Sequence, residues 1–303
     1  MISLLSRALL MSTPLLFGAI GEVFAERSGV MICAIEGIFL VGALGGFVGA
    51  YVGGHLYLGL LLAMASGLAV AAFYGWITVY LKQHQVVTGT AISILATGLA
   101  SYFMRVCFGT PILPLTVEPM KAVPLPLLSR IPVLGPVLFT QNPLTYGVYV
   151  LVPATWFVLY RTSLGLTIRS AGENPEAVDV AGIQVDRVRF AMVLLAGLLG
   201  GVAGAFYSIG YLGMFTANII GGRGWIAFAI CFLGNWNPLG ILAGTLVFGL
   251  AEAIAIYMQA SGPLLFPNEF FIALPYLLTI ALTLSRKSFN VPAKLGLPYR
   301  KED

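Results

Sequence analysis

Charged side chains are scarce in this chain of 303 residues: aspartate, glutamate, lysine and arginine together make up 9% of it, while 59% of the residues are hydrophobic. A soluble globular protein carries about 25% charged residues, because water must solvate its surface. The mean hydropathy of +0.94 points the same way. We therefore exclude soluble enzymes, nucleic-acid-binding proteins and disordered chains, and expect a membrane protein whose main solvent is the lipid bilayer.

Residue types that carry catalysis or bind metals are also few. The three cysteines, Cys33, Cys107 and Cys231, lie in separate apolar runs and are interpreted as small buried hydrophobic side chains. The two histidines, His55 and His84, lie near expected span ends, far from any paired carboxylates. The sequence has no GxxxxGK[ST] phosphate loop and no haem, dinucleotide or zinc pattern. We expect no enzyme activity, metal or cofactor on this chain.

The 28 charged residues are unevenly distributed, since eight lie between Arg161 and Arg189 and seven between Arg286 and Asp303. The long, nearly uncharged stretches elsewhere suit hydrocarbon, where one charge costs at least about 2.5–3.5 kcal/mol. We predict an all-α integral membrane bundle of about 8–10 transmembrane helices, since about 20 apolar residues cross a bilayer. The expected spans are 4–21, 29–52, 56–80, 86–108, 144–160, 190–212, 219–234, 238–258 and 268–285.

Two places in this series leave alternatives open. The first span follows Arg7 and so resembles a signal peptide, but no small-residue cleavage site follows it, and we expect it to be retained. The motif Asn235-Trp236-Asn237-Pro238 divides one long apolar run into the seventh and eighth spans. One of these two is a candidate for a re-entrant helix.

The spans form a single transmembrane domain over residues 1–303, with a Pro-rich external loop at 109–143, a cytoplasmic loop at 161–189 and a cytoplasmic tail at 286–303. Nine crossings with loop 161–189 inside leave only five basic residues outside, which supports an outer N-terminus and an inner C-terminus. Those five are Arg7, Arg105, Lys121, Arg130 and Arg223. Without the seventh crossing, the predicted side of the tail would reverse.

The external loop contains eight prolines from Pro111 to Pro143, which exclude a continuous helix. It is either an irregular cap over the outer mouth or a simple loop.

Glycines within the spans recur in small-residue patterns such as Gly197, Gly200, Gly201 and Gly204. These patterns predict close helix packing.

The cytoplasmic loop carries its own helix signals. Asn174 suits the N-cap, Pro175 the first helical position and Glu176 the positive end of the helix dipole, while Gly182 can terminate the helix. The result is a two-turn helix outside the membrane. Because isolated helices need about 12–15 residues even for marginal stability, we expect this one to dock onto another protein. The alternative is a helix that lies on the bilayer surface.

Three groups of sequence motifs in this chain resemble those of a known family. Gly172–Ile183 resembles the cytoplasmic coupling loop of ABC-importer permeases of the branched-chain amino acid, ribose and nucleoside group. Glu26–Val30 followed by Ile35–Gly37 is similar to the ERSGV and IEG signature of nucleoside permeases that work with BmpA-like binding lipoproteins. With Gly224–Ala227 and Asn237–Gly240, the similar motifs extend over most of the chain.

The resemblance implies a permease subunit in the cytoplasmic (inner) membrane of a prokaryote, forming half of a pathway for nucleosides; simple sugars or riboflavin are the alternatives. The implied partners are a second homologous permease, a cytoplasmic ABC ATPase that binds ATP and Mg, and an external substrate-binding lipoprotein. The ATPase-coupling residues it implies are Glu173, Asn174, Pro175, Glu176, Ala177, Val178, Asp179, Ala181 and Gly182. The family often has two alanines where Ala177 and Val178 stand, so the valine puts close contact there in question.

Ionisable residues inside spans mark sites, pores or pairings by default, and Glu36 and Glu252 are both of this kind. For Glu36 the alternatives are a substrate contact and a structural hydrogen bond to glycine-exposed backbone on a neighbouring helix. A nucleoside is flat, polar and uncharged, so its pathway needs hydrogen-bonding groups and aromatic faces. The candidate lining residues are Glu36, Tyr207, Asn218, Trp225 and Asn235.

Two other classes of protein compete with this interpretation. An ion-driven secondary transporter would carry inverted repeats with carboxylates at matching positions, for which Glu36 and Glu252 are the only candidates. It would also leave the capped cytoplasmic helix without a purpose. An intramembrane enzyme would need a nucleophile and base, or metal ligands, on facing spans, and the sequence supplies no such set.

Overall fold

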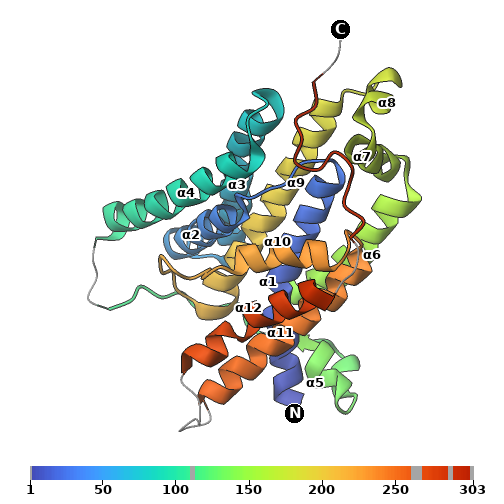
Figure 1. The fold of residues 1–303 in the computed structure, drawn as a ribbon. Helices are drawn as coiled ribbons and strands as arrows, with labels where there is room; N and C mark the ends of the chain where they lie inside the picture. The colour runs from blue at the N-terminus through green and yellow to red at the C-terminus, as the bar shows by residue number, and fades with distance from the viewer. Residues whose placement is uncertain (1, 110–112, 261–267, 286–288, 301–303) are drawn as a thin grey trace.

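The computed structural model, which describes residues 2–109, 113–260, 268–285 and 289–300, is a bundle of helices (Figure 1). The long helices are α1 (Ile2–Arg27), α2 (Ile35–Gly53), α3 (Leu56–Gly75), α4 (Gln85–Phe108), α6 (Pro143–Arg161), α9 (Val185–Ala205), α11 (Pro238–Ala260) and α12 (Asn268–Ser285). The π-helical turns η1 (Trp76–Tyr80) and η3 (Phe206–Leu212) continue α3 and α9. The shorter elements are η2 (Leu128–Arg130), α5 (Leu134–Leu138), α7 (Ser163–Glu173), α8 (Pro175–Val180), α10 (Arg223–Leu233) and the strands β1 (Val123–Pro124) and β2 (Thr140–Gln141).

The expected all-α membrane bundle is confirmed. Within the described residues, 7 helices are long and apolar enough to cross a membrane: Ile2–Arg27, Ile35–Gly53, Leu56–Tyr80, Gln85–Phe108, Pro143–Arg161, Val185–Leu212 and Pro238–Gln259. Each matches one predicted span, although the first helix continues past the predicted end at residue 21. The backbone of α12 coincides with the predicted span 268–285.

The predicted seventh span, 219–234, is wrong as a complete crossing. Only Arg223–Leu233 is helical, and 11 residues extend about 16 Å, roughly half of the hydrocarbon thickness. Gly221 and Gly222 before it, and Asn235 and Trp236 after it, have positive φ angles that interrupt the helix. In Figure 1, α10 lies across the bundle instead of along it.

Two loops are held in place by backbone contacts with distant parts of the chain. In the Pro-rich loop, Thr116 forms an isolated β-bridge with Met214, which follows η3. At the end that carries α7 and α8, opposite the N-terminus in Figure 1, the Lys294 N–H of the tail donates to the Gly172 carbonyl at 2.9 Å. The described part of the tail therefore lies beside the loop 161–189, although α10 is too short for a full span.

The buried core is centred on α1, which packs against α6, α9, α10 and α11. Close approach of α2 and α9 depends on glycine: a Cβ atom on Gly42 would lie 2.7 Å from the Gly201 Cα atom. The predicted small-residue packing is therefore confirmed at this contact. By contrast, α4 presents apolar side chains outward, with Ile94 74% exposed, as a surface facing lipid or a partner subunit requires.

The Pro-rich loop folds back onto η3, the continuation of α9, and onto the turn that follows it. The Val117 N–H donates to the Gly213 carbonyl at 2.7 Å, and Asn142 Nδ2 donates to the Gly210 carbonyl at 2.9 Å. The strands β1 and β2 pair antiparallel within it, with Val123 opposite Gln141. Residues 110–112 lie outside the described residues.

Candidate functional site

The helix α8 has both of the predicted caps. Asn174 Oδ1 accepts a hydrogen bond from the Ala177 N–H at 3.1 Å, and Pro175 occupies the first helical position. Gly182 has φ of +82°, and its N–H donates to the Asp179 carbonyl at 2.9 Å, which ends the helix. The local signals that predict this helix are therefore all present in the structure.

The two faces of α8 differ in burial. Val178 is buried and packs with Ala171 and Val185 of the same chain. On the other face, Ala177 and Ala181 are exposed and Val180 is 90% exposed. The valine at position 178 is thus turned inward, and the face available to another protein carries small or unhindered side chains.

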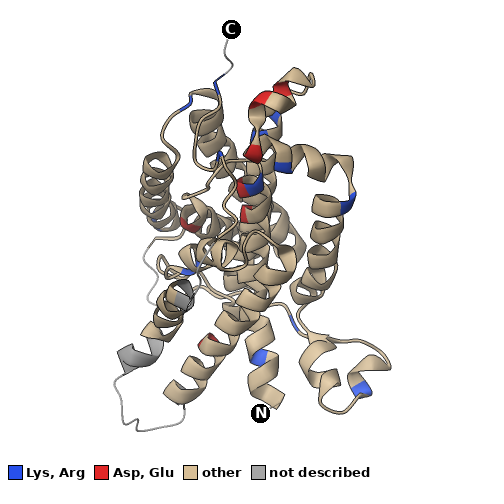
Figure 2. Ribbon diagram, turned by 45° about the vertical axis from the view of Figure 1, so that its right-hand side comes forward, with Lys and Arg blue, Asp and Glu red and all other residues tan. Residues whose placement is uncertain are grey.

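Charged residues gather around α7, α8 and the start of α9, at the end of the bundle opposite the N-terminus (Figure 2). Lys82 Nζ lies 2.5 Å from Asp186 Oδ1 and joins the end of η1 to α9. Arg161 and Arg169 lie over the rings of Trp156 and Tyr160, at 5.4 Å and 5.1 Å from the ring centroids. These contacts hold the segments that precede and follow α8 in place.

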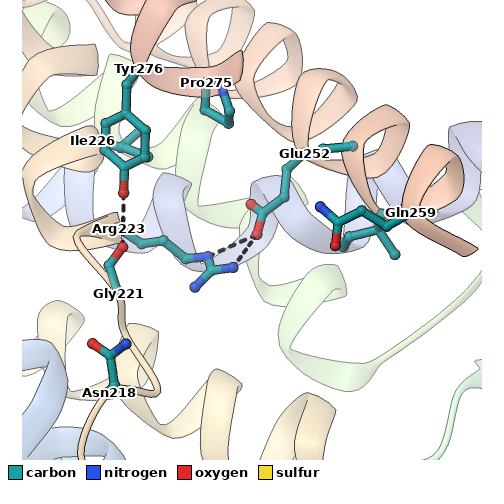
Figure 3. Close-up of a pocket in the computed structure, with 10 residues that line it drawn as sticks. Asn218, Gly221, Arg223, Ile226, Glu252, Gln259, Pro275 and Tyr276 are labelled. Atoms are coloured by element: carbon teal, nitrogen blue, oxygen red, sulfur yellow. Dashed lines mark hydrogen bonds and ion pairs between the residues drawn. The ribbon is translucent and has the colours of Figure 1, made fainter. Parts of the chain in front are cut away.

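A second polar region, the α10 pocket, lies between α10, α11 and α12 (Figure 3). It has a volume of about 330 Å³ and is lined by Asn218, Arg223, Glu252, Gln259 and Tyr276, with apolar neighbours. The guanidinium of Arg223 donates to Glu252 Oε1 from Nε at 2.8 Å and from Nη2 at 2.6 Å. Glu252 lies about 12 Å along α11 from its C-terminal end at Ala260, so the pair is well removed from the end of the helix.

Glu36 holds the beginning of α10. Its two carboxylate oxygens each accept one backbone hydrogen bond at 2.8 Å, from the N–H groups of Gly222 and Gly224. A carboxylate is favourable there because the first N–H groups of a helix lack partners within the helix. Of the two roles open for Glu36, the structure shows the hydrogen bonds to glycine-exposed backbone.

The other candidate lining residues are only partly brought together. Asn218 lines the α10 pocket, and the ring of Tyr207 lies under the guanidinium of Arg223, 5.4 Å from its centroid. The Tyr207 hydroxyl is buried and has no hydrogen-bond partner among the described residues. Trp225 lies outside the pocket lining and packs edge-on against Phe228.

Asn235 is not among the residues that line the α10 pocket and contacts the C-terminal tail instead. Its Oδ1 accepts a hydrogen bond from the Asn290 N–H of the tail at 2.7 Å.

The sequence alone predicts no site role for Arg223, Gln259 or Tyr276, and it places Arg223 among the outer basic residues. The signal that could have found Arg223 is its position between apolar runs that also contain Glu252, since opposite charges inside a membrane domain pair with each other.

Several known transport permeases are similar to this chain in sequence. The family described as "Branched-chain amino acid transport system / permease component" matches residues 4–283. The nucleoside ABC transporter permease protein NupC of Lactococcus lactis is 35% identical over 98% of this chain and 96% of its own length. The guanosine ABC transporter permease protein NupQ of Bacillus subtilis is 35% identical over 97% of this chain and 95% of its own.

A Haloferax volcanii permease named for glucose transport, TsgC13, is also 35% identical, over 88% of this chain and 80% of its own. Among solved structures, an ABC transporter described as of metal-chelate type, in an inward-facing conformation, has the same fold with a TM-score of 0.54 and 17% identity. The similarity covers 94% of this chain and 87% of that one. The chain therefore belongs to the family of branched-chain amino acid transport system permease components, as a multi-pass transporter subunit of the cytoplasmic (inner) membrane and not as an enzyme.

Proposed function

We propose that this chain forms half of the translocation pathway of an ATP-driven importer of nucleosides. The observation that carries the proposal is α8, a capped helix of 6 residues whose Val180 face is exposed outside the bundle. A helix this short gains its order from its caps and from Val178, and its outer face is free to contact a partner. In this proposal the partner is a cytoplasmic ABC ATPase.

ATP and Mg would be bound by that ATPase, and this chain would hold no cofactor. Closure of the ATPase would move α8, and α7 and α9 would carry the movement into the bundle. A second, homologous permease would supply the other half of the pathway. An external binding lipoprotein would deliver the substrate at the opposite end, near the Pro-rich cap.

The chemistry of the α10 pocket supports an uncharged polar substrate. Its two charged side chains, Arg223 and Glu252, neutralise each other; the other polar groups are the Asn218 and Gln259 amides and the Tyr276 hydroxyl, which donates to the Gly221 carbonyl at 2.9 Å. Such groups can exchange hydrogen bonds with a ribose or a base without a charged ring. The full-length similarity to NupC and NupQ favours a nucleoside, and the similarity to TsgC13 makes a simple sugar the second candidate.

The docking role can be tested with Ala177→Arg, which places a long cation on the exposed face of α8. In the complete complex reconstituted in vesicles, we expect ATP-dependent uptake to be abolished while the chain still inserts. Ser163→Arg is the matched control, because it adds the same side chain at an exposed position of α7. Uptake that persists with Ala177→Arg would exclude docking through this face.

The energy source and the substrate need separate measurements. Replacing the catalytic glutamate of the ATPase should stop uptake while ion gradients remain intact. Uptake that instead followed the ion gradient would establish a secondary transporter. Competition of adenosine, uridine, riboflavin and glucose for the external binding protein would then separate the candidate substrates.

A further inference from the structure

The described part of the C-terminal tail, residues 289–300, connects two regions that are far apart in the sequence. At its beginning, Phe289 packs against the main core and the Asn290 N–H donates to Asn235 Oδ1 at 2.7 Å. Asn235 belongs to the turn between α10 and α11. The tail is therefore attached to the end of the helix whose beginning lines the α10 pocket.

Farther along, the tail is attached to the base of α8. The Ala293 N–H donates to Glu173 Oε2 at 3.2 Å, and the Lys294 N–H donates to the Gly172 carbonyl at 2.9 Å. Glu173 and Gly172 directly precede Asn174, the N-cap of α8. The Lys294 ammonium also lies 3.6 Å from Glu176 Oε1, an exposed contact of small energetic value.

The buried side chain of Arg189 also binds the tail through a hydrogen bond. Its side chain is buried and donates to three carbonyls: Ser28 at 3.0 Å, Leu297 at 2.9 Å and Ala171 at 3.2 Å. One guanidinium thus joins α9, the end of α7, the connection between α1 and α2, and the tail. Hydrogen bonds from a charged donor are stronger than neutral ones, so these segments move together.

The turn at Asn235 and Trp236 is itself held at the inner end of α1. Arg27 Nε donates to the Trp236 carbonyl at 3.2 Å, and Trp236 Nε1 donates to the Glu26 carboxylate. Both turn residues have positive φ angles, 57° for Asn235 and 52° for Trp236, so the turn keeps an uncommon backbone shape through these contacts. A displacement of the turn would move α10, and with it Arg223 at the pocket.

We propose that the tail segment 289–300 is a relay that passes displacement of the α8 base to the α10–α11 turn, and so to the α10 pocket. This inference rests on the proposed function, since α8 must be moved by an ATPase for the relay to act. The helices α7 and α9, which flank α8 in the chain, connect it to the long helices of the bundle. The tail connects the base of α8 to the short helix α10. Asn290 and Lys294 are the positioning residues, one at each attachment.

Two proline substitutions test the relay by deleting single backbone N–H donors. Asn290→Pro removes the bond from the tail to Asn235, and Lys294→Pro removes the bond from the tail to the Gly172 carbonyl at the base of α8. The matched controls are Asn290→Ala and Lys294→Ala, which keep the N–H groups. The assay is uptake per ATP hydrolysed in vesicles containing the complete complex, with whichever of radiolabelled adenosine, uridine or glucose the unaltered complex accumulates.

We expect each proline variant to lower uptake per ATP by about 3- to 10-fold, the equilibrium value of one hydrogen bond. The ATPase rate and the amount of assembled complex should stay near those of the unaltered protein, and the alanine controls should keep normal coupling. Asn235→Gly removes the acceptor of the same bond while tolerating its positive φ, so combining it with Asn290→Pro should add no further loss.

The relay is refuted if both proline variants transport as much per ATP as the unaltered complex. It is equally refuted if uptake, ATPase rate and assembled complex fall in proportion, because that pattern indicates a purely structural tail. The proposed function fails separately, if the unaltered complex accumulates none of the three solutes or accumulates one without ATP hydrolysis.

Discussion

The ion pair of Arg223 and Glu252 can be tested with a double-mutant cycle of Arg223→Met and Glu252→Leu. The side chains are 31% and 12% exposed, so the pair is largely withdrawn from solvent. Removing one partner of a buried pair costs about 3–5 kcal/mol, because the remaining charge is uncompensated. Since Arg223 keeps some access to water, we expect about 3 kcal/mol for each single variant.

The double variant should be more stable than the sum of the single effects predicts, since it leaves no unpaired charge. A coupling free energy of about 2–3 kcal/mol is expected from unfolding of the detergent-solubilised chain by sodium dodecyl sulfate. Single effects that add within about 0.5 kcal/mol would refute the pairing argument.

Uptake by the same variants separates structure from transport. If the pair helps to bind substrate, the double variant regains stability but uptake stays low. If uptake returns together with stability, the charges of Arg223 and Glu252 are not required for transport.

Three further predictions address contacts described above. Glu36→Gln replaces a carboxylate that accepts two backbone N–H groups with an amide that has one acceptor oxygen, and should cost about 1–3 kcal/mol in the same unfolding assay. Asn174→Ala should cost about 1 kcal/mol locally, seen as faster hydrogen exchange of the α8 amides, whereas Asn174→Asp should retain the cap; equal exchange in both would contradict the capping role. Gly42→Val should prevent close packing against Gly201 and lower the yield of folded protein, and a normal yield would disprove the tight α2–α9 contact.

Elements specified by local signals could be predicted from the sequence. The long spans follow from uninterrupted hydropathy, and α8 follows from Asn174, Pro175 and Gly182, which act within one or two turns. The α10 segment was predicted too long because hydropathy does not record the positive φ angles at its ends. Apolar composition shows only which solvent a segment tolerates.

The parts of the site that depend on distant partners could not be predicted in the same way. Asn235 is equally suitable for a substrate and for a backbone N–H, and its partner Asn290 is 55 residues away. Likewise, Glu36 was known to need a partner inside the membrane, but the amides of Gly222 and Gly224 are brought to it only by the fold. For such residues the sequence predicts the need for a partner and leaves its identity open.

The central position of α1 has a consequence for how the protein is made. This helix is synthesised before the helices that pack around it, yet Glu26 receives its hydrogen bond from Trp236, which is separated from it by 210 residues. At about 5–20 residues per second, that partner follows roughly 10–40 s later. During this interval the membrane-insertion machinery must shelter a helix that carries the carboxyl groups of Glu22 and Glu26, so the core is completed only after α10 has been synthesised.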